Sequence, residues 1–145
     1  MPAVVVPKVA VSNVSVSPRT FSAAGRKVHG TCVKPSTRNK ADKPCQRPVK
    51  LTAKYTLNAA ATVSFRLALQ TSGRKVSGKC VKGSRKNKHD HKCMLLVSVH
   101  NTIRRSGVAG SNKFTFTGKL VAGTYELTVT PAGGTAHTVT FKVSG

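Results

Sequence analysis

Short segments in which apolar and polar residues alternate recur along most of the chain. The alternating apolar residues are Val, Leu, Ala, Phe and Tyr, and they occur in residues 51–57, 63–69, 95–99, 114–116, 125–129 and 139–143. A period of two places one set of side chains on a buried strand face and the other set in solvent. We find no apolar repeat of helical period. The pattern therefore predicts an all-β domain of seven or eight strands.

The first alternating segment changes phase. Val9 and Val11 share one parity, and Val14 and Val16 share the opposite one. An extra residue in a strand produces such a change, as when a first strand crosses from one sheet to another. We therefore expect a bulge or kink near Ser12–Asn13.

A short motif near the C-terminus predicts a corner between strands. In LVAGTYELTV, the residues Leu120, Gly123 and Tyr125 form an L-x-x-G-x-Y arrangement that leads into a strand. In Greek-key sandwiches a tyrosine at such a corner hydrogen-bonds back to the chain a few residues upstream. The alternative is an ordinary half-buried tyrosine, and the late position of the motif favours the corner.

One phrase occurs twice in the chain. GRKVHGTCVKPSTRNKADKPC at residues 25–45 and GRKVSGKCVKGSRKNKHDHKC at residues 73–93 are identical at 13 of 21 positions. The segments that precede the two copies differ, so the chain is not a pair of tandem domains. We interpret residues 9–145 as one domain that carries the same basic loop at 25–50 and 73–93. Residues 1–8 would form an N-terminal linker or an extra strand.

Much of the chain resembles a known class of module. The residues that carry the resemblance are Ala61–Phe65, Gly73–Cys80, Cys93, Gly110–Gly118 and Leu120–Val129. They resemble the immunoglobulin-like or fibronectin-type-III-like modules in secreted and cell-surface proteins of high-G+C Gram-positive bacteria. The resemblance implies a Greek-key β-sandwich and an extracellular or cell-surface location, and it implies no catalytic residues. The copy at 25–50 would be an insertion between the first and second strands.

The four cysteines allow three interpretations. Twelve residues separate the partners in each copy, and each copy had to be viable alone, which favours disulfides Cys32–Cys45 and Cys80–Cys93. A zinc site with His89 and His91 is disfavoured, because the tight Cys and His spacings of zinc sites are missing. Free thiols would require a reducing compartment. We expect no metal and no other cofactor.

The net charge is the strongest indication of a partner. The chain has 25 basic and 3 acidic residues, a net charge of +22, and each loop holds eight basic residues and one acid. Such an excess attracts polyanions. The candidate binding residues are Lys34, Arg38, Lys40, Lys43, Lys79, Lys82, Arg85, Lys86, Lys88 and Lys92. No aromatic residue lies in either loop, so any binding of nucleic acid would be nonspecific.

The sequence does not predict an enzyme. The three carboxylates, Asp42, Asp90 and Glu126, form no recognisable acid pair, and no nucleophile, phosphate-loop or metalloprotease motif is present. We expect Asp42 and Asp90 to serve as local counter-ions or turn residues.

Two functional hypotheses remain. The first is a non-catalytic extracellular structural or adhesion module, for which cell-surface glycans are possible partners. The second is charge-driven binding of nucleic acid, acidic glycan or an anionic surface through the basic loops. An extracellular origin requires that a signal peptide has been removed, because residues 1–6 are too short for one; a native chain starting at Met1 would instead be cytosolic. We expect no membrane span, and Val4–Val6 could pair with the sheet edge of a second copy.

Overall fold

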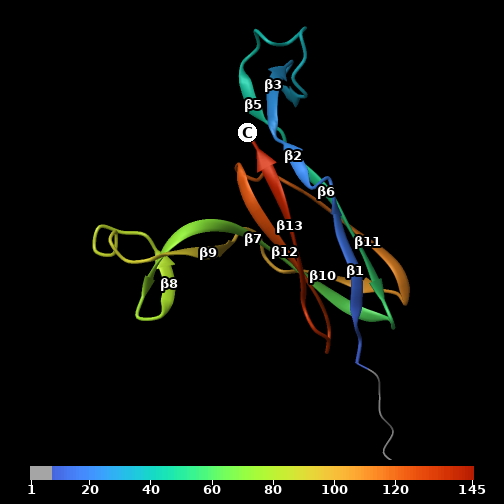
Figure 1. Ribbon diagram of the computed structural model, residues 1–145. Helices are drawn as coiled ribbons and strands as arrows, with labels where there is room; N and C mark the ends of the chain where they lie inside the picture. The colour runs from blue at the N-terminus through green and yellow to red at the C-terminus, as the bar shows by residue number, and fades with distance from the viewer. Residues whose placement is uncertain (1–7) are drawn as a thin grey trace, which may run out of the picture.

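The computed structural model describes residues 8–145, and its regular elements in that range are all β-strands (Figure 1). The all-β prediction is therefore confirmed. Two sheets face each other across a hydrophobic core, and two smaller strand groups extend from them. The proposed linker or strand at the N-terminus lies outside the described residues, apart from Lys8.

The smaller sandwich sheet contains three antiparallel strands. Their order is β1 (Val11–Ser17), β6 (Val49–Leu57) and β11 (Gly110–Gly118). In β6 every second side chain is buried, from Val49 to Leu57, as the alternating pattern predicts. The intervening Lys and Thr side chains lie on the outer face.

The larger sheet is built around a 16-residue strand, β7 (Ala61–Val76). Its path runs β10 (Ile103–Gly107), β7, β12 (Gly123–Pro131), β13 (His137–Ser144) and β2 (Thr20–Ser22). Only the first part of β7 belongs to the sandwich, because its pairing with β12 ends at Leu69. Beyond that point β7 pairs with β8 (Lys79–Lys82) and β9 (Lys92–Ser98).

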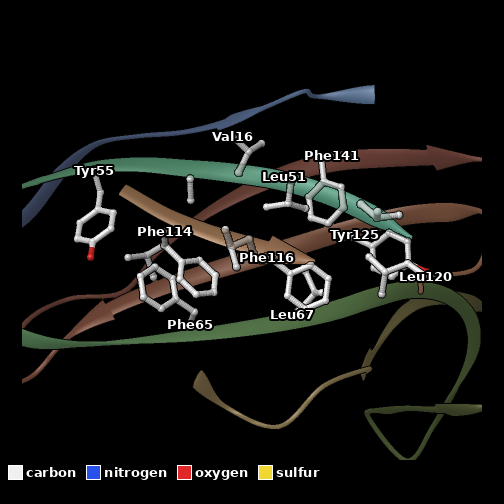
Figure 2. Close-up of a cluster of buried hydrophobic side chains, with 14 of the residues drawn as sticks. Val16, Leu51, Tyr55, Phe65, Leu67, Phe114, Phe116, Leu120, Tyr125 and Phe141 are labelled. Carbon is white, nitrogen blue, oxygen red and sulfur yellow. The ribbon is translucent and has the colours of Figure 1, made fainter. Parts of the chain in front are cut away.

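The core lies between the two sheets and contains the aromatic side chains (Figure 2). Phe65 of β7 stacks on Phe114 of β11 with ring centroids 4.0 Å apart, which joins the sheets at one end. Tyr125 stacks on Phe141 at 5.4 Å towards the other end. Burial of these rings supplies the main driving force for folding.

The phase change in the first strand is a bulge. The register of β1 against β6 shifts between Ser12 and Ser15, and Asn13 has a φ of 51°. Val11 and Val16 are thereby both buried. The chain crosses to the other sheet only after Ser17, where β2 pairs in parallel with β13. The predicted bulge is correct, whereas the crossing between sheets is a separate event further along the chain.

The tyrosine motif forms a corner at the start of β12. The Tyr125 hydroxyl donates a hydrogen bond of 2.6 Å to the carbonyl oxygen of Val121, four residues upstream. Leu120 is buried beside it. Burial also raises the pKa of the Tyr125 phenol above its ordinary value, as it does for Tyr55.

Three expectations about the strands need correction. Residues 8–145 form 13 strands rather than seven or eight, of which eight belong to the sandwich paths. Residues 95–99 were expected to form a core strand, but β9 pairs with the outer half of β7, and the side chain of Val97 is 43% exposed. The two basic segments are not loops throughout: strands form the base of each, those of the second segment as part of the larger sheet, and loops remain at residues 34–43 and 83–91.

Candidate functional site: two cationic arms

The first copy of the repeat folds into a three-stranded sheet, which we call arm 1 (residues 24–46). Its central strand, β3 (Ala24–Val28), pairs with β4 (Thr31–Val33) on one side and β5 (Pro44–Gln46) on the other. Arm 1 extends from the top of the sandwich in Figure 1, close to the C-terminus. It forms a sheet of its own, separate from both sandwich sheets.

The second copy folds in the same way into arm 2 (residues 70–98). The outer half of β7 takes the place of β3, β8 that of β4, and β9 that of β5. Arg26 faces Val33 and Pro44 across arm 1, and Arg74 faces Val81 and Lys92, the equivalent positions of arm 2. Arm 2 leaves the sandwich in a different direction, at the left of Figure 1.

A disulfide joins the outer strands of each arm. Cys32 bonds to Cys45 and Cys80 to Cys93, each with 5.9 Å between the Cα atoms, so the cysteines pair within each copy as the repeat predicts. A glycine on the central strand makes room for the bridge. A Cβ atom on Gly73 would lie 2.7 Å from Sγ of Cys80, and one on Gly25 would lie 2.5 Å from Sγ of Cys32. This is why glycine occurs at the same place in both copies.

A buried asparagine organises the tip of each arm. In arm 1 the Asn39 Oδ1 atom accepts a 2.8 Å bond from the Ser36 N–H, and its Nδ2 donates a 3.0 Å bond to the Lys34 carbonyl. In arm 2 Asn87 makes the same two bonds, with Ser84 and Lys82. Sequence analysis did not single out these asparagines. Their identity in both copies, directly after two positions that differ, is the signal that could have found them.

An arginine closes the base of each tip. The Arg26 Nη1 atom donates a 3.0 Å bond to the backbone carbonyl of Asp42, and Arg74 does the same to Asp90 at 2.9 Å. The aspartates therefore contribute to the turn through their backbone rather than through the carboxylates. The hairpin turn between the first two strands needs positive φ at two residues, which are His29 and Gly30 in arm 1 and Ser77 and Gly78 in arm 2.

The candidate cationic residues are all exposed, and they divide into two sets. Arm 1 holds Lys34, Arg38, Lys40 and Lys43; arm 2 holds Lys79, Lys82, Arg85, Lys86, Lys88 and Lys92. The structure gathers each set on its own arm but does not bring the two sets together (Figure 1). With 3 acidic residues for 25 basic ones, 25 − 3 = 22 cationic side chains have no carboxylate partner of their own.

The arms join the sandwich differently. At the end of arm 1 the Gln46 amide donates to the Leu120 carbonyl, and the next residue, Arg47, donates to the Ala24 carbonyl and lies over the Phe21 ring. The equivalent residues after the second copy are Met94 and Leu95. Leu95 is half-buried, and Met94 is 58% exposed.

Within residues 8–145, no group of three or more His, Cys, Asp or Glu side chains lies close enough to hold a metal ion. The four sulfur atoms are bonded to one another in pairs. Over the same range, no helix is long and apolar enough to cross a bilayer.

No model of a known protein family matches the chain, and no curated protein matches it. Among solved structures, the chain is similar to β-glucosidase from Listeria innocua in complex with glucose, with 11% sequence identity and a TM-score of 0.36. The match covers 94% of this chain but 16% of the chain of that structure. A similarity of this size assigns neither a fold family nor an activity.

Proposed function

We propose that the protein is a non-catalytic extracellular module that binds anionic polymers through its two arms, without reading their sequence. The observation that carries the proposal is a set of matched lysines. Lys27, Lys34 and Lys40 recur as Lys75, Lys82 and Lys88, and all six side chains are exposed.

Other identities between the copies have a structural reason. The glycines make room for the disulfides, the arginines close the tips and the asparagines hold the turns. The matched lysines take part in no side-chain hydrogen bond within the described residues. Repetition of a cation without an internal partner favours an external one, and phosphate, sulfate and carboxylate are the groups that lysine binds.

The distribution of charge and of aromatic residues supports a nonspecific mode. Arm 2 carries a net charge of +7, from eight basic residues and one aspartate, and arm 1 carries +5, from six basic residues and one aspartate, with Arg47 and Lys50 directly beyond it. None of the seven aromatic residues lies on an arm, and six of them are buried in the core. Base stacking is therefore not part of the mode, and the attraction should fall steeply as salt rises.

Two arms on one scaffold favour long polymers. Once one arm holds a polymer, the second arm meets the same chain at a raised effective concentration. A polymer that spans both arms then gains affinity without any new type of contact. Short oligomers that reach one arm would lack this gain. Cell-surface acidic glycans and anionic wall polymers are long enough to contact both arms. Binding of such polymers would attach the protein to a cell surface, so that polyanion binding also serves adhesion.

We further propose that the sandwich is of the immunoglobulin-like or fibronectin-type-III-like class and that the module is secreted or displayed at the cell surface. In immunoglobulin-like domains the strands A, B and E share one sheet and C, F and G the other. The orders β1-β6-β11 and β7-β12-β13 fit this arrangement, and the Tyr125 corner fits it as well. Two disulfides suit an oxidising compartment.

The test is elution from immobilised heparin in a salt gradient. One variant neutralises arm 1 (Lys34→Gln, Arg38→Gln, Lys40→Gln, Lys43→Gln) and another neutralises arm 2 (Lys82→Gln, Arg85→Gln, Lys86→Gln, Lys88→Gln). The matched control removes the same charge from the sandwich (Lys50→Gln, Lys54→Gln, Lys113→Gln, Lys142→Gln). Each arm variant should elute at clearly lower salt than the control, and the two together should lose retention. Equal elution of the arm variants and the control would show that retention depends on the total charge of the surface and not on the arms, and it would overturn the proposal.

A further inference from the structure

One face of arm 2 combines exposed apolar side chains with cations. Residues that lie opposite each other in register project to the same side of a sheet. Arg74 pairs with Val81 and Lys92, and Ser72 pairs with Met94. We call this side the M-face, and its residues are Gln70, Ser72, Arg74, Val76, Lys79, Val81, Lys92, Met94, Leu96 and Ser98. The disulfide and Gly73 lie on the opposite side.

The M-face holds most of the large apolar side chains that the described residues expose. Of the seven such residues, Val76 (38% exposed), Val81 (37%), Met94 (58%) and Leu96 (49%) belong to it. Met94 and Leu96 are neighbours on β9, two residues apart. A clustered apolar surface of this kind marks an interaction site more often than scattered surface residues do.

Arm 1 shows that the M-face is not needed to build an arm. The same fold there has Gln46 at the position of Met94 and Pro48 at the position of Leu96. The valines equivalent to Val76 and Val81 are Val28 and Val33, which are half-buried. The exposed side chains of Met94 and Leu96 therefore serve something other than the local fold.

The charges around the M-face define the partner. Arg74, Lys79 and Lys92 lie among the apolar side chains. The carboxylate on this side is that of Glu126, at the base of the face, where it accepts a 3.2 Å hydrogen bond from the Gln70 amide. The tip beyond adds Arg85, Lys86 and Lys88. A partner must then offer an apolar layer beneath a dense layer of negative charge. A bilayer with anionic headgroups has both layers, and lysine stems can lie along its apolar region while the ammonium groups reach the phosphates.

We propose that arm 2 docks its M-face on the surface of bilayers that contain anionic lipid. Met94 and Leu96 enter the boundary between headgroups and acyl chains, and Arg74, Lys79 and Lys92 contact the phosphates. Arm 2 extends away from the sandwich (Figure 1), so the sandwich does not obstruct a flat surface. This docking goes beyond the polymer binding proposed above, because it requires apolar side chains as well as charge.

The first test is co-sedimentation with vesicles of phosphatidylglycerol and phosphatidylcholine, compared with vesicles of phosphatidylcholine alone. The natural chain should partition to the anionic vesicles only. Met94→Gln with Leu96→Gln should weaken partitioning by about tenfold or more, because two apolar side chains no longer enter the bilayer. The matched control is Val108→Gln with Val121→Gln, which removes two equally exposed apolar residues of the sandwich and should change little.

The two proposals fail in different ways. The Met94/Leu96 variant keeps every charge, so its heparin elution should equal that of the natural chain. Equal heparin elution of the arm variants and the sandwich control, with vesicle partitioning of the natural chain that is lost in the Met94/Leu96 variant, would contradict polymer binding alone. Equal partitioning of the Met94/Leu96 variant and the natural chain would show attraction by charge only and overturn the docking. Failure of the natural chain to sediment with anionic vesicles would also overturn it, in favour of an apolar and acidic protein partner.

A second measurement reports directly how deeply residue 94 enters the bilayer. The chain has no tryptophan, so a single introduced indole is an unambiguous probe. Met94→Trp should shift its emission to the blue on anionic vesicles and be quenched by lipids brominated on their acyl chains. Gln46→Trp, the equivalent position of arm 1, should do neither. A Met94→Trp emission that stays at its aqueous wavelength would contradict insertion.

Discussion

The two arms have nearly the same sequence and the same internal structure, but they are attached differently. Each has a disulfide over a glycine, a buried asparagine in its tip and an arginine bonded to an aspartate carbonyl. After the second cysteine the sequences diverge. The local fold is thus specified within about 20 residues, whereas the docking of each arm is specified by the few residues that follow.

Those following residues have opposite consequences. In arm 1, Gln46 and Arg47 bond to the sandwich and to the base of the arm, so its last strand is short and fixed. In arm 2, the chain continues as the long strand β9, and Met94 and Leu96 face solvent. A duplicated unit can thus keep its internal structure while the residues that follow it change how it is attached and which side chains it exposes.

Removal of the disulfides should have the largest effect on the arms. Each bridge closes a segment with a sequence separation of 13, and the chain-entropy treatment gives about 3 kcal/mol for a loop of that size. Cys32→Ser with Cys45→Ser should free β4 and β5 together. Cys80→Ser with Cys93→Ser should free β8 and the tip but leave β9 paired to β7 at Leu95–Ser98, because that ladder is longer. Hydrogen exchange of the arm amides measures both outcomes.

The sandwich is the internal control for this experiment. Amides of β6 and β12 should keep their protection in both double variants, because the core does not include the arms. Collapse of the whole protein would show instead that the arms are integral to the domain. Equal loss of β5 and β9 would contradict the difference in attachment.

The tip asparagines should have the next largest effect. Asn39→Ala or Asn87→Ala removes two side-chain hydrogen bonds and leaves a Ser N–H and a Lys carbonyl without those partners, at a cost of about 2 kcal/mol to the local structure. The cost should be the same in both arms, because the geometry is the same. Hydrogen exchange of the tip amides, together with heparin elution of each variant, checks the prediction. Unequal effects would mean that the tips depend on their surroundings.

The sandwich could be predicted from the sequence because its information is local and periodic. Alternation at Leu51–Leu57 and Tyr125–Val129 predicts which strand faces are buried, and the repeated spacing of the cysteines predicts the disulfide pairing. The strands inside the basic segments were missed because Lys and Arg hide the alternation there. Gly25, Gly30 and Asn39 carry that structure through close packing, a positive φ and burial, which no polarity pattern displays.

The placement of β9 failed for a different reason. The apolar residues Leu95, Val97 and Val99 look like a core strand, but β7, with 16 residues, is longer than an ordinary sandwich strand. The outer half of β7 has backbone groups free to pair away from the core, and β9 forms its hydrogen bonds there. The M-face could not be foreseen either, because it depends on which residues share a register across β7, β8 and β9.

Arg47 should test the attachment of arm 1 with an intermediate effect. Arg47→Ala removes the hydrogen bonds to the carbonyls of Ser22 and Ala24 and the contact with the Phe21 ring, which we expect to cost about 1.5 kcal/mol. Protection of β5 should fall while protection of β9 stays unchanged. Leu95→Ala, at the equivalent position, is the matched variant and should affect arm 2 only. An effect of Arg47→Ala on both arms would contradict their independence.

Substitution of Tyr125 should have the smallest effect on stability, and that effect should again differ between the two arms. The phenol bonds to Val121, in the same turn whose Leu120 carbonyl accepts the Gln46 amide of arm 1. Tyr125→Phe should cost about 1 kcal/mol and loosen arm 1 slightly, with no effect on arm 2. Burial raises the pKa of this phenol, so its contribution is complete below the unfolded value of about 10 and is lost as pH rises through the folded value. The natural chain should therefore lose stability above about pH 10, and Tyr125→Phe should lose less over the same interval. Denaturant unfolding at several pH values, with Tyr55→Phe as the second buried phenol, provides the measurement, and parallel pH curves for all three proteins would exclude the role of Tyr125.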